Sequence, residues 1–132
     1  MAKITRKFLK MFGQTGATAN FGQFGSAKAG AAATSKDVEA LQALAAWLGG
    51  WQDATITNAY GFAPFQEDMN AVCYVLGYHL AYLQQEGVSE WNNDTTYYIG
   101  SIVKKTGTFE LYGSLTDTNT SNALPSQTSD TK

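Results

Sequence analysis

Hydrophobic positions recur at intervals of three and four residues in two stretches of the chain, which is the spacing of one face of an α-helix. In the first stretch, Thr34 or Ser35 is the expected N-cap, Asp37 and Glu39 lie in the first turn, and Gly49-Gly50 ends the pattern. The apolar positions between them are Val38, Leu41, Leu44, Ala45, Trp47 and Leu48. This spacing predicts one amphipathic helix.

The second stretch predicts a helix over residues 64–86, with Pro64 at its first position and Gly87 as its stop. Its apolar seam comprises Phe65, Met69, Val72, Cys73, Leu76, Leu80 and Leu83. Tyr74, Tyr78 and Tyr82 recur at intervals of four, so their rings share a helix face. Because the short preceding helix can cover only one face, we expect the three tyrosines to form an oligomer interface. The alternative is that they pack on the chain's own β-module.

From about residue 90 the pattern changes to short aromatic and β-branched runs separated by glycine or by clusters of Asn, Asp, Ser and Thr. Runs of this kind are typical of short antiparallel strands joined by turns. Residues 90–125 are therefore expected to form a small β-module. The expected fold class is α+β, with an extended N-terminal arm, a two-helix segment and this module.

Residues 1–33 form a Gly-, Ala- and Phe-rich segment that is too poor in large apolar side chains to fold alone. We expect an extended arm that becomes ordered against partner proteins, with Phe8, Phe12, Phe21 and Phe24 as anchors. Four basic residues fall within residues 1–10, and a solvated terminus is the alternative for that part. The expected regions are thus the arm at 1–33, the two helices at 34–89, the β-module at 90–125, and a linker or the start of a further region at 126–132.

Charged residues make up only 15% of the chain, and the formal net charge is −2. A surface this poor in charge does little to prevent association, so we expect a homo-oligomer. One cysteine and one histidine offer no cluster for a metal, and we expect no metal, no cofactor and no disulfide within the chain. Four basic residues make a weak case for nucleic-acid binding, and no stretch is apolar enough to predict membrane insertion.

Candidate catalytic residues are few. Glu67 and Asp68 are adjacent on a helix and point about 100° apart, so the two cannot flank one glycosidic bond, and helix capping explains them better. His79 lies beside the apolar seam and is expected to be a packing residue. No nucleophile motif occurs. The sequence therefore predicts no catalytic residues and a protein that is not an enzyme.

The β-module opens with Trp91 and continues through Gly100, Val103, Gly107, Tyr112 and Ser114. This spacing resembles that of the small chitin-binding type of carbohydrate-binding module, families five and twelve. The resemblance places Gly100 and Val103 on the first hairpin, Gly107 at the turn, and Tyr112 with Ser114 on the next strand. Such modules usually close with another tryptophan after the proline, whereas no aromatic follows Tyr112 here.

One interpretation of the module is that Trp91, Tyr97, Tyr98 and Tyr112 stack on the rings of a host-surface glycan, with Asp117 and Asn119 bonding its hydroxyls. The other is that these aromatics form the module's own small core, because about 40 residues need most of their aromatics to hold together.

Two further stretches, Glu67–Trp91 and Thr96–Ser101, follow the Gly/Phe-rich arm along the chain. With them, the succession of arm, helices and module over residues 12–125 is similar to the N-terminal, virion-attaching part of bacteriophage tail fibres. It implies a structural virion protein made in the host cytoplasm and located in the tail. It further implies that the arm attaches to other tail proteins and that a receptor-binding region follows the β-module. From the tyrosine face of the second helix we expect a trimer or ring contact, with a trimer favoured.

Overall fold

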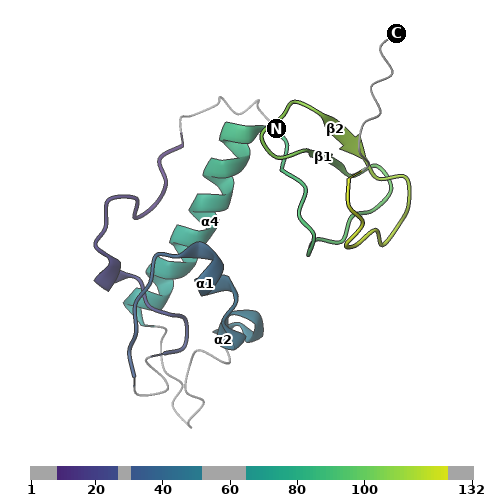
Figure 1. Cartoon of the computed structure of the whole chain (residues 1–132). Coiled ribbons are helices and arrows are strands. Elements are labelled where there is room, and N and C mark those ends of the chain that lie inside the picture. Colours follow the sequence, from purple (N-terminus) through teal and green to yellow (C-terminus); the bar gives the residue numbers. More distant parts are fainter. Residues whose placement is uncertain (1–8, 27–30, 52–64, 125–132) are drawn as a thin grey trace, which may run out of the picture. The chain divides into compact units, whose positions relative to one another are not determined.

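The structure, a computed structural model, describes residues 9–26, 31–51 and 65–124. The chain divides into unit 1, Met1–Tyr82, and unit 2, Leu83–Lys132. The elements are η1 (Thr18–Asn20), α1 (Val38–Gln42), α2 (Ala45–Gly49), α4 (Gln66–Glu86), β1 (Ile102–Lys104) and β2 (Leu111–Gly113) (Figure 1). Helices together with a small antiparallel sheet confirm the α+β class. Phe8 and Pro64 lie outside the described residues.

The first predicted helix is two short helices. Asp37, and not Thr34 or Ser35, is the N-cap of α1, because its Oδ1 accepts a hydrogen bond from the Ala40 N–H at 3.0 Å. Leu44 has extended backbone angles, φ −67° and ψ 134°, and separates α1 from α2. With this break, α1 places Leu41 in the core while α2 places Trp47 against the ring of Phe24.

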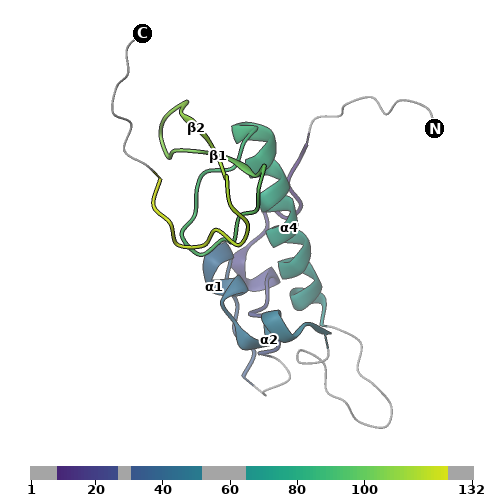
Figure 2. The ribbon, with the colours of Figure 1, turned by 90° about the vertical axis from the view of Figure 1, so that its right-hand side faces the viewer.

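Helix α4 has 21 residues and supplies one wall of the unit 1 core. It ends where predicted, since the Gly87 N–H bonds to the Leu83 carbonyl at 2.9 Å and Gly87 has φ +73°. Its buried side chains are Asp68, Ala71, Tyr74 and Val75. Figures 1 and 2 both show α1 beside the N-terminal half of α4.

The core of unit 1 forms between the glycine-rich arm and the helices. Its buried members are Phe21, Leu41, Ala71, Tyr74 and Val75, with Met11, Val38 and Trp47 packed around them. Phe21 is only 2% exposed and Phe24 5%. The expectation that the arm has no core within its own chain is therefore wrong for the described residues, because α4 supplies the apolar surface that the arm lacks.

Backbone hydrogen bonds fix the arm on both sides. The Gly22 N–H donates to the Glu67 carbonyl at 2.9 Å, at the start of α4. On the other side, the Ser35 N–H donates to the Phe21 carbonyl at 2.9 Å, and Gly22 forms an antiparallel bridge with Thr34. The arm residues around Phe21 thus lie between α4 and the segment that leads into α1.

Unit 2 is built on a hairpin in which β1 and β2 pair antiparallel, with Val103 opposite Tyr112. Gly107, at φ +71°, lies in the connecting turn, as predicted. Gly100 precedes β1 and Ser114 follows β2, and the Gly100 N–H bonds to the Ser114 carbonyl at 3.1 Å. Tyr97 and Asn119 form a further antiparallel bridge, which closes the two ends of the module on each other.

Candidate functional site

The apolar seam of α4 is largely exposed. Leu76 is 56% exposed and Leu80 55%, although the sequence assigns the seam to the face that the preceding helix covers. Phe65, Met69, Cys73 and Leu83 are also exposed, and Val72 is half-buried. The core instead receives the opposite side of the helix through Tyr74, Ala71 and Val75. An exposed apolar face of this length and composition is typical of an interaction surface.

The three tyrosines of α4 do not share one environment. Tyr74 is buried, and its ring centroid lies 5.1 Å from that of Phe21. Its assignment to an oligomer interface is therefore wrong, because Phe21 from the arm occupies the position expected for a partner. Tyr78 is exposed and Tyr82 is half-buried. For these two residues an interface stays a prediction.

The predicted anchor residues also differ in their exposure to solvent. Phe21 and Phe24 are buried within the chain, where Phe24 contacts Trp47 and Trp51 at centroid distances of 5.6 and 4.8 Å. Neither ring can fill a pocket of a tail protein, so their assignment as anchors is wrong. Phe12 is half exposed. Of the four predicted anchors, it is the one that the structure describes with an accessible ring.

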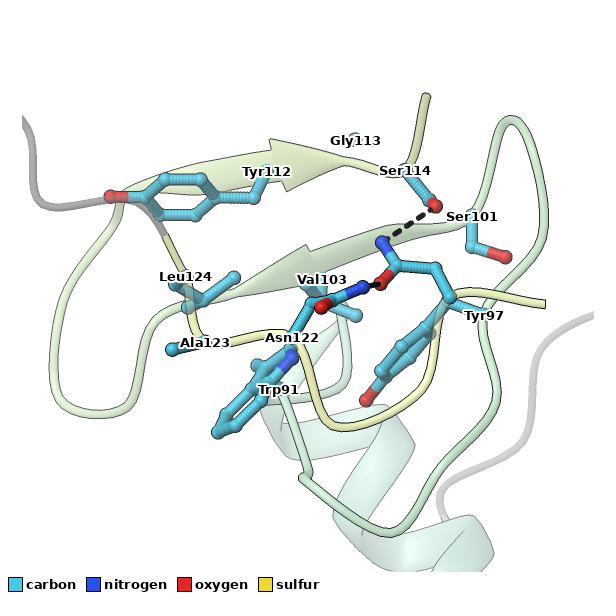
Figure 3. A pocket seen from close by; sticks show the side chains of 11 residues that line it. Trp91, Tyr97, Ser101, Val103, Tyr112, Gly113, Ser114, Asn122, Ala123 and Leu124 are labelled. Atoms are coloured by element: carbon cyan, nitrogen blue, oxygen red, sulfur yellow. Dashed lines mark hydrogen bonds between the residues drawn. The ribbon is translucent and has the colours of Figure 1, made fainter. Parts of the chain in front are cut away.

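In unit 2, three of the four candidate sugar-stacking aromatics line one hollow of about 110 Å³. Trp91 and Tyr97 lie in the segment before β1, and Tyr112 lies on β2 (Figure 3). Val103, Asn119, Asn122 and Leu124 also contribute to the wall. Tyr98, by contrast, is exposed and does not line the hollow.

Three polar side chains that line this hollow, those of Ser114, Asn119 and Asn122, are joined to one another by hydrogen bonds. Asn119 Nδ2 donates to Ser114 Oγ at 3.1 Å, and Asn122 Nδ2 donates to Asn119 Oδ1 (Figure 3). Asp117, which the sequence suggests as a sugar ligand, accepts a hydrogen bond from the Ile99 N–H at 3.1 Å. Both predicted hydrogen-bonding residues, Asp117 and Asn119, therefore hold the module together.

Tyr112 presents a neutral phenol. Its hydroxyl donates to Glu110 Oε2 at 3.0 Å. Desolvation raises the pKa of Tyr112, and both the hydrogen bond to Glu110 and the negative charge of that carboxylate raise it further. The ring therefore offers an uncharged face at the hollow at neutral pH.

Asp68 is a buried carboxyl whose role is not evident in the sequence, where it reads as an ordinary first-turn acid. It is 2% exposed, and its Oδ2 has no hydrogen-bond partner among the described residues. Burial raises the pKa of Asp68; a hydrogen bond from the Gly25 backbone opposes this shift, and the charge of Glu67 adds to it. Its Oδ1 lies so close to Gly22 that a Cβ there would approach it to 2.8 Å. Asp68 thus joins α4 to the arm.

Within residues 9–26, 31–51 and 65–124, no group of three or more His, Cys, Asp or Glu side chains is arranged to hold a metal ion. The described helices include none that is long and apolar enough to span a membrane. His79 Nε2 lies 3.0 Å from Gln42 Oε1, which links α4 to α1.

Comparisons of the chain with protein-family models, with curated proteins and with solved structures found no match.

Proposed function

We propose that this chain is a structural virion protein, a subunit of a bacteriophage tail fibre or a related tail appendage. In this role it attaches to the tail and leads to a host-receptor-binding region. The observation that carries the proposal is the exposed apolar face of α4 in a chain with only 15% charged residues. A protein that works alone in solution gains nothing from such a surface, whereas a subunit buries it on assembly.

The resemblance of residues 12–125 to tail-fibre attachment regions supports the same role. Burial of Phe21 and Phe24 changes how the attachment would work. The arm contributes part of a folded unit, and the side chains left for tail contacts are those that this unit exposes, Phe12 among them. Phe8, which lies outside the described residues, stays a predicted anchor.

Labelling purified virions with an antibody against this chain tests the role. We expect label at the tail of each particle in electron micrographs. A Phe12→Ala variant should enter virions at a reduced copy number, while Phe109→Ala, which changes a fully exposed ring in unit 2, should enter at the wild-type level. Virions that carry no label would contradict the proposal.

The hollow of unit 2 favours a second candidate, a carbohydrate-binding protein. Trp91, Tyr97 and Tyr112 meet there, and aromatic faces suit the C–H surfaces of pyranose rings. Its volume is well below the roughly 300–1,000 Å³ of enclosed ligand sites, so a sugar would lie across the opening.

Calorimetric titration with chitin oligosaccharides tests this candidate. Binding should weaken by about tenfold, which is about 1.4 kcal/mol, on Tyr112→Ala. Tyr98→Ala is the matched control, because Tyr98 lies outside the hollow. Equal loss in both variants, or no binding by the wild-type chain, would exclude the hollow as the sugar site.

A further inference from the structure

Five exposed side chains of α4 follow the spacing of a coiled coil. Met69, Cys73, Leu76, Leu80 and Leu83 are separated by four, three, four and three residues. This alternation is the a/d pattern of a heptad, in which Cys73 and Leu80 take position a and the other three take position d. We call these five residues the heptad stripe. All five are exposed.

The chain's own core uses the other side of α4. At 100° per residue, Ala71, Tyr74 and Val75 point away from the heptad stripe, and these are the residues that contact Phe21 and Leu41. Other segments of unit 1 reach the helix beside the stripe. A Cβ at Gly77 would lie 3.4 Å from Met11 Cγ, and His79 bonds to Gln42. The described residues of unit 1 therefore form their core without covering the stripe.

The charges on α4 favour an identical partner. From Met69 to Gln85 the helix has no Asp, Glu, Lys or Arg. The positions that flank the a/d stripe, where coiled coils carry the charges that select partners, hold Asn70, Val72, Gly77, His79, Gln84 and, at the C-terminal end of the helix, Glu86. Glu86 pairs with Lys104 of its own chain, so two copies can approach along Met69–Gln85 without like-charge repulsion. A basic or acidic partner, by contrast, would find no complementary charge.

We propose that a second copy of this chain packs along the heptad stripe of α4 as a parallel coiled coil. The parallel direction rests on the proposed function, because the subunits of one fibre leave the tail in the same direction. In this arrangement each stripe residue meets its own counterpart, so Cys73 faces Cys73 of the second copy. This interface uses the face opposite the buried Tyr74, and so differs from one built on the tyrosines.

Sedimentation of the full chain tests the surface. We expect the wild type to be oligomeric in a concentration-dependent way and Leu76→Glu or Leu80→Glu to be monomeric, because each places a charge in the stripe. Both side chains are exposed in the protomer, so helical circular dichroism should persist. Tyr78→Glu is the matched control on the same helix, exposed but outside the stripe, and should stay oligomeric. A monomeric wild type, or dissociation by Tyr78→Glu alone, overturns the proposal.

Mild oxidation tests the direction without a destabilising mutation. Parallel copies should give a Cys73–Cys73 disulfide dimer on a non-reducing gel, because residues at the same height across such an interface are close enough to bridge. Cys73→Ser and Leu80→Glu should both abolish the band. In an antiparallel pair centred on Leu76, the two Cys73 residues would be roughly 9 Å apart along the axis at a rise of 1.5 Å per residue. An oligomer that gives no disulfide therefore overturns the parallel arrangement.

The oligomerisation experiments and the virion-labelling experiment can fail independently of each other. Oligomerisation through the stripe combined with unlabelled virions would leave the interface standing and remove the tail role. Labelled virions combined with a monomeric wild-type chain would support the tail role and remove the interface.

Discussion

At the scale of single residues, Lys36 joins the arm to the core of unit 1. Its Nζ donates hydrogen bonds to the carbonyls of Gly13, Gln14 and Gly16 at 3.2, 3.1 and 3.0 Å. The same ammonium lies 5.0 Å from the ring centroid of Phe21 and 4.9 Å from that of Tyr74. One side chain thus closes the turn at Gly13–Gly16 and covers two core rings.

Replacing Lys36 with Met keeps most of the side-chain volume and removes these bonds. Hydrogen bonds to a charged group contribute about 1.5–3 kcal/mol and cation–π contacts about 0.5–1 kcal/mol. We therefore expect the free energy of unfolding of unit 1 to fall by about 2–3 kcal/mol in urea titrations followed by helical circular dichroism. Lys105→Met is the control, because its 3.5 Å pair with Glu110 is on the surface and should contribute less than about 1 kcal/mol. Equal losses in the two variants would contradict the role of Lys36.

The raised pKa of Asp68 predicts that the free energy of unfolding decreases as the pH rises. Its pKa in the folded chain is raised above the ordinary value of 3.8, so the folded state holds the proton more tightly than the unfolded state does. The associated stability is fully present below pH 3.8 and is lost as the pH rises through the folded-state pKa. Urea titrations at several pH values should show the wild type losing stability relative to Asp68→Asn over that range. A difference between the two proteins that does not change with pH would contradict the shift.

At the scale of elements, the sequence predicts where turns and helix ends lie along the chain better than it predicts which face of a helix is buried. The hairpin around Gly107 and the end of α4 at Gly87 lie where local turn chemistry puts them. The break at Leu44 and the exposed seam of α4 do not follow from local pattern. Both faces of α4 are apolar, and the choice between them depends on Phe21, which arrives from a segment about 50 residues earlier.

The composition of the arm suggests that its glycines only make it flexible, whereas Gly13 is needed for a close contact in the folded chain. Gly13 has φ +69°, and a Cβ there would lie 2.6 Å from Cζ of Phe21. We expect Gly13→Ala to destabilise unit 1 by more than about 1 kcal/mol, because it adds backbone strain to a close contact. A Cβ at Gly113 would meet nothing within 4 Å, so Gly113→Ala should be nearly neutral when both variants are compared by thermal unfolding. A neutral Gly13→Ala would mean that the turn can shift away from Phe21.

At the scale of the whole molecule, sequence reasoning fails most clearly for the arm. Low complexity suggests a segment that folds only on a partner, yet Phe21 and Phe24 complete the core of unit 1. In unit 2, by contrast, the expected hairpin is present and three of the four candidate aromatics line one hollow, while sugar binding stays a prediction. The difference is one of range, because the hairpin and its aromatics form from about 35 consecutive residues, while the arm's partner is a distant helix.

This assignment of the arm predicts the effect of its removal. Truncating a buried Phe to Ala costs about 3–5 kcal/mol, and a small domain has only about 5–15 kcal/mol in total. Deleting residues 1–26 removes Phe21 and Phe24 and exposes the buried side of α4, so we expect most of the helical circular dichroism to be lost. Unit 2 has its own hydrogen bonds, and amide exchange should still show the β1–β2 pairing protected. If the truncated chain keeps its full helical signal, then the arm is not part of the core of unit 1. In that case Phe21 and Phe24 return as candidate anchors.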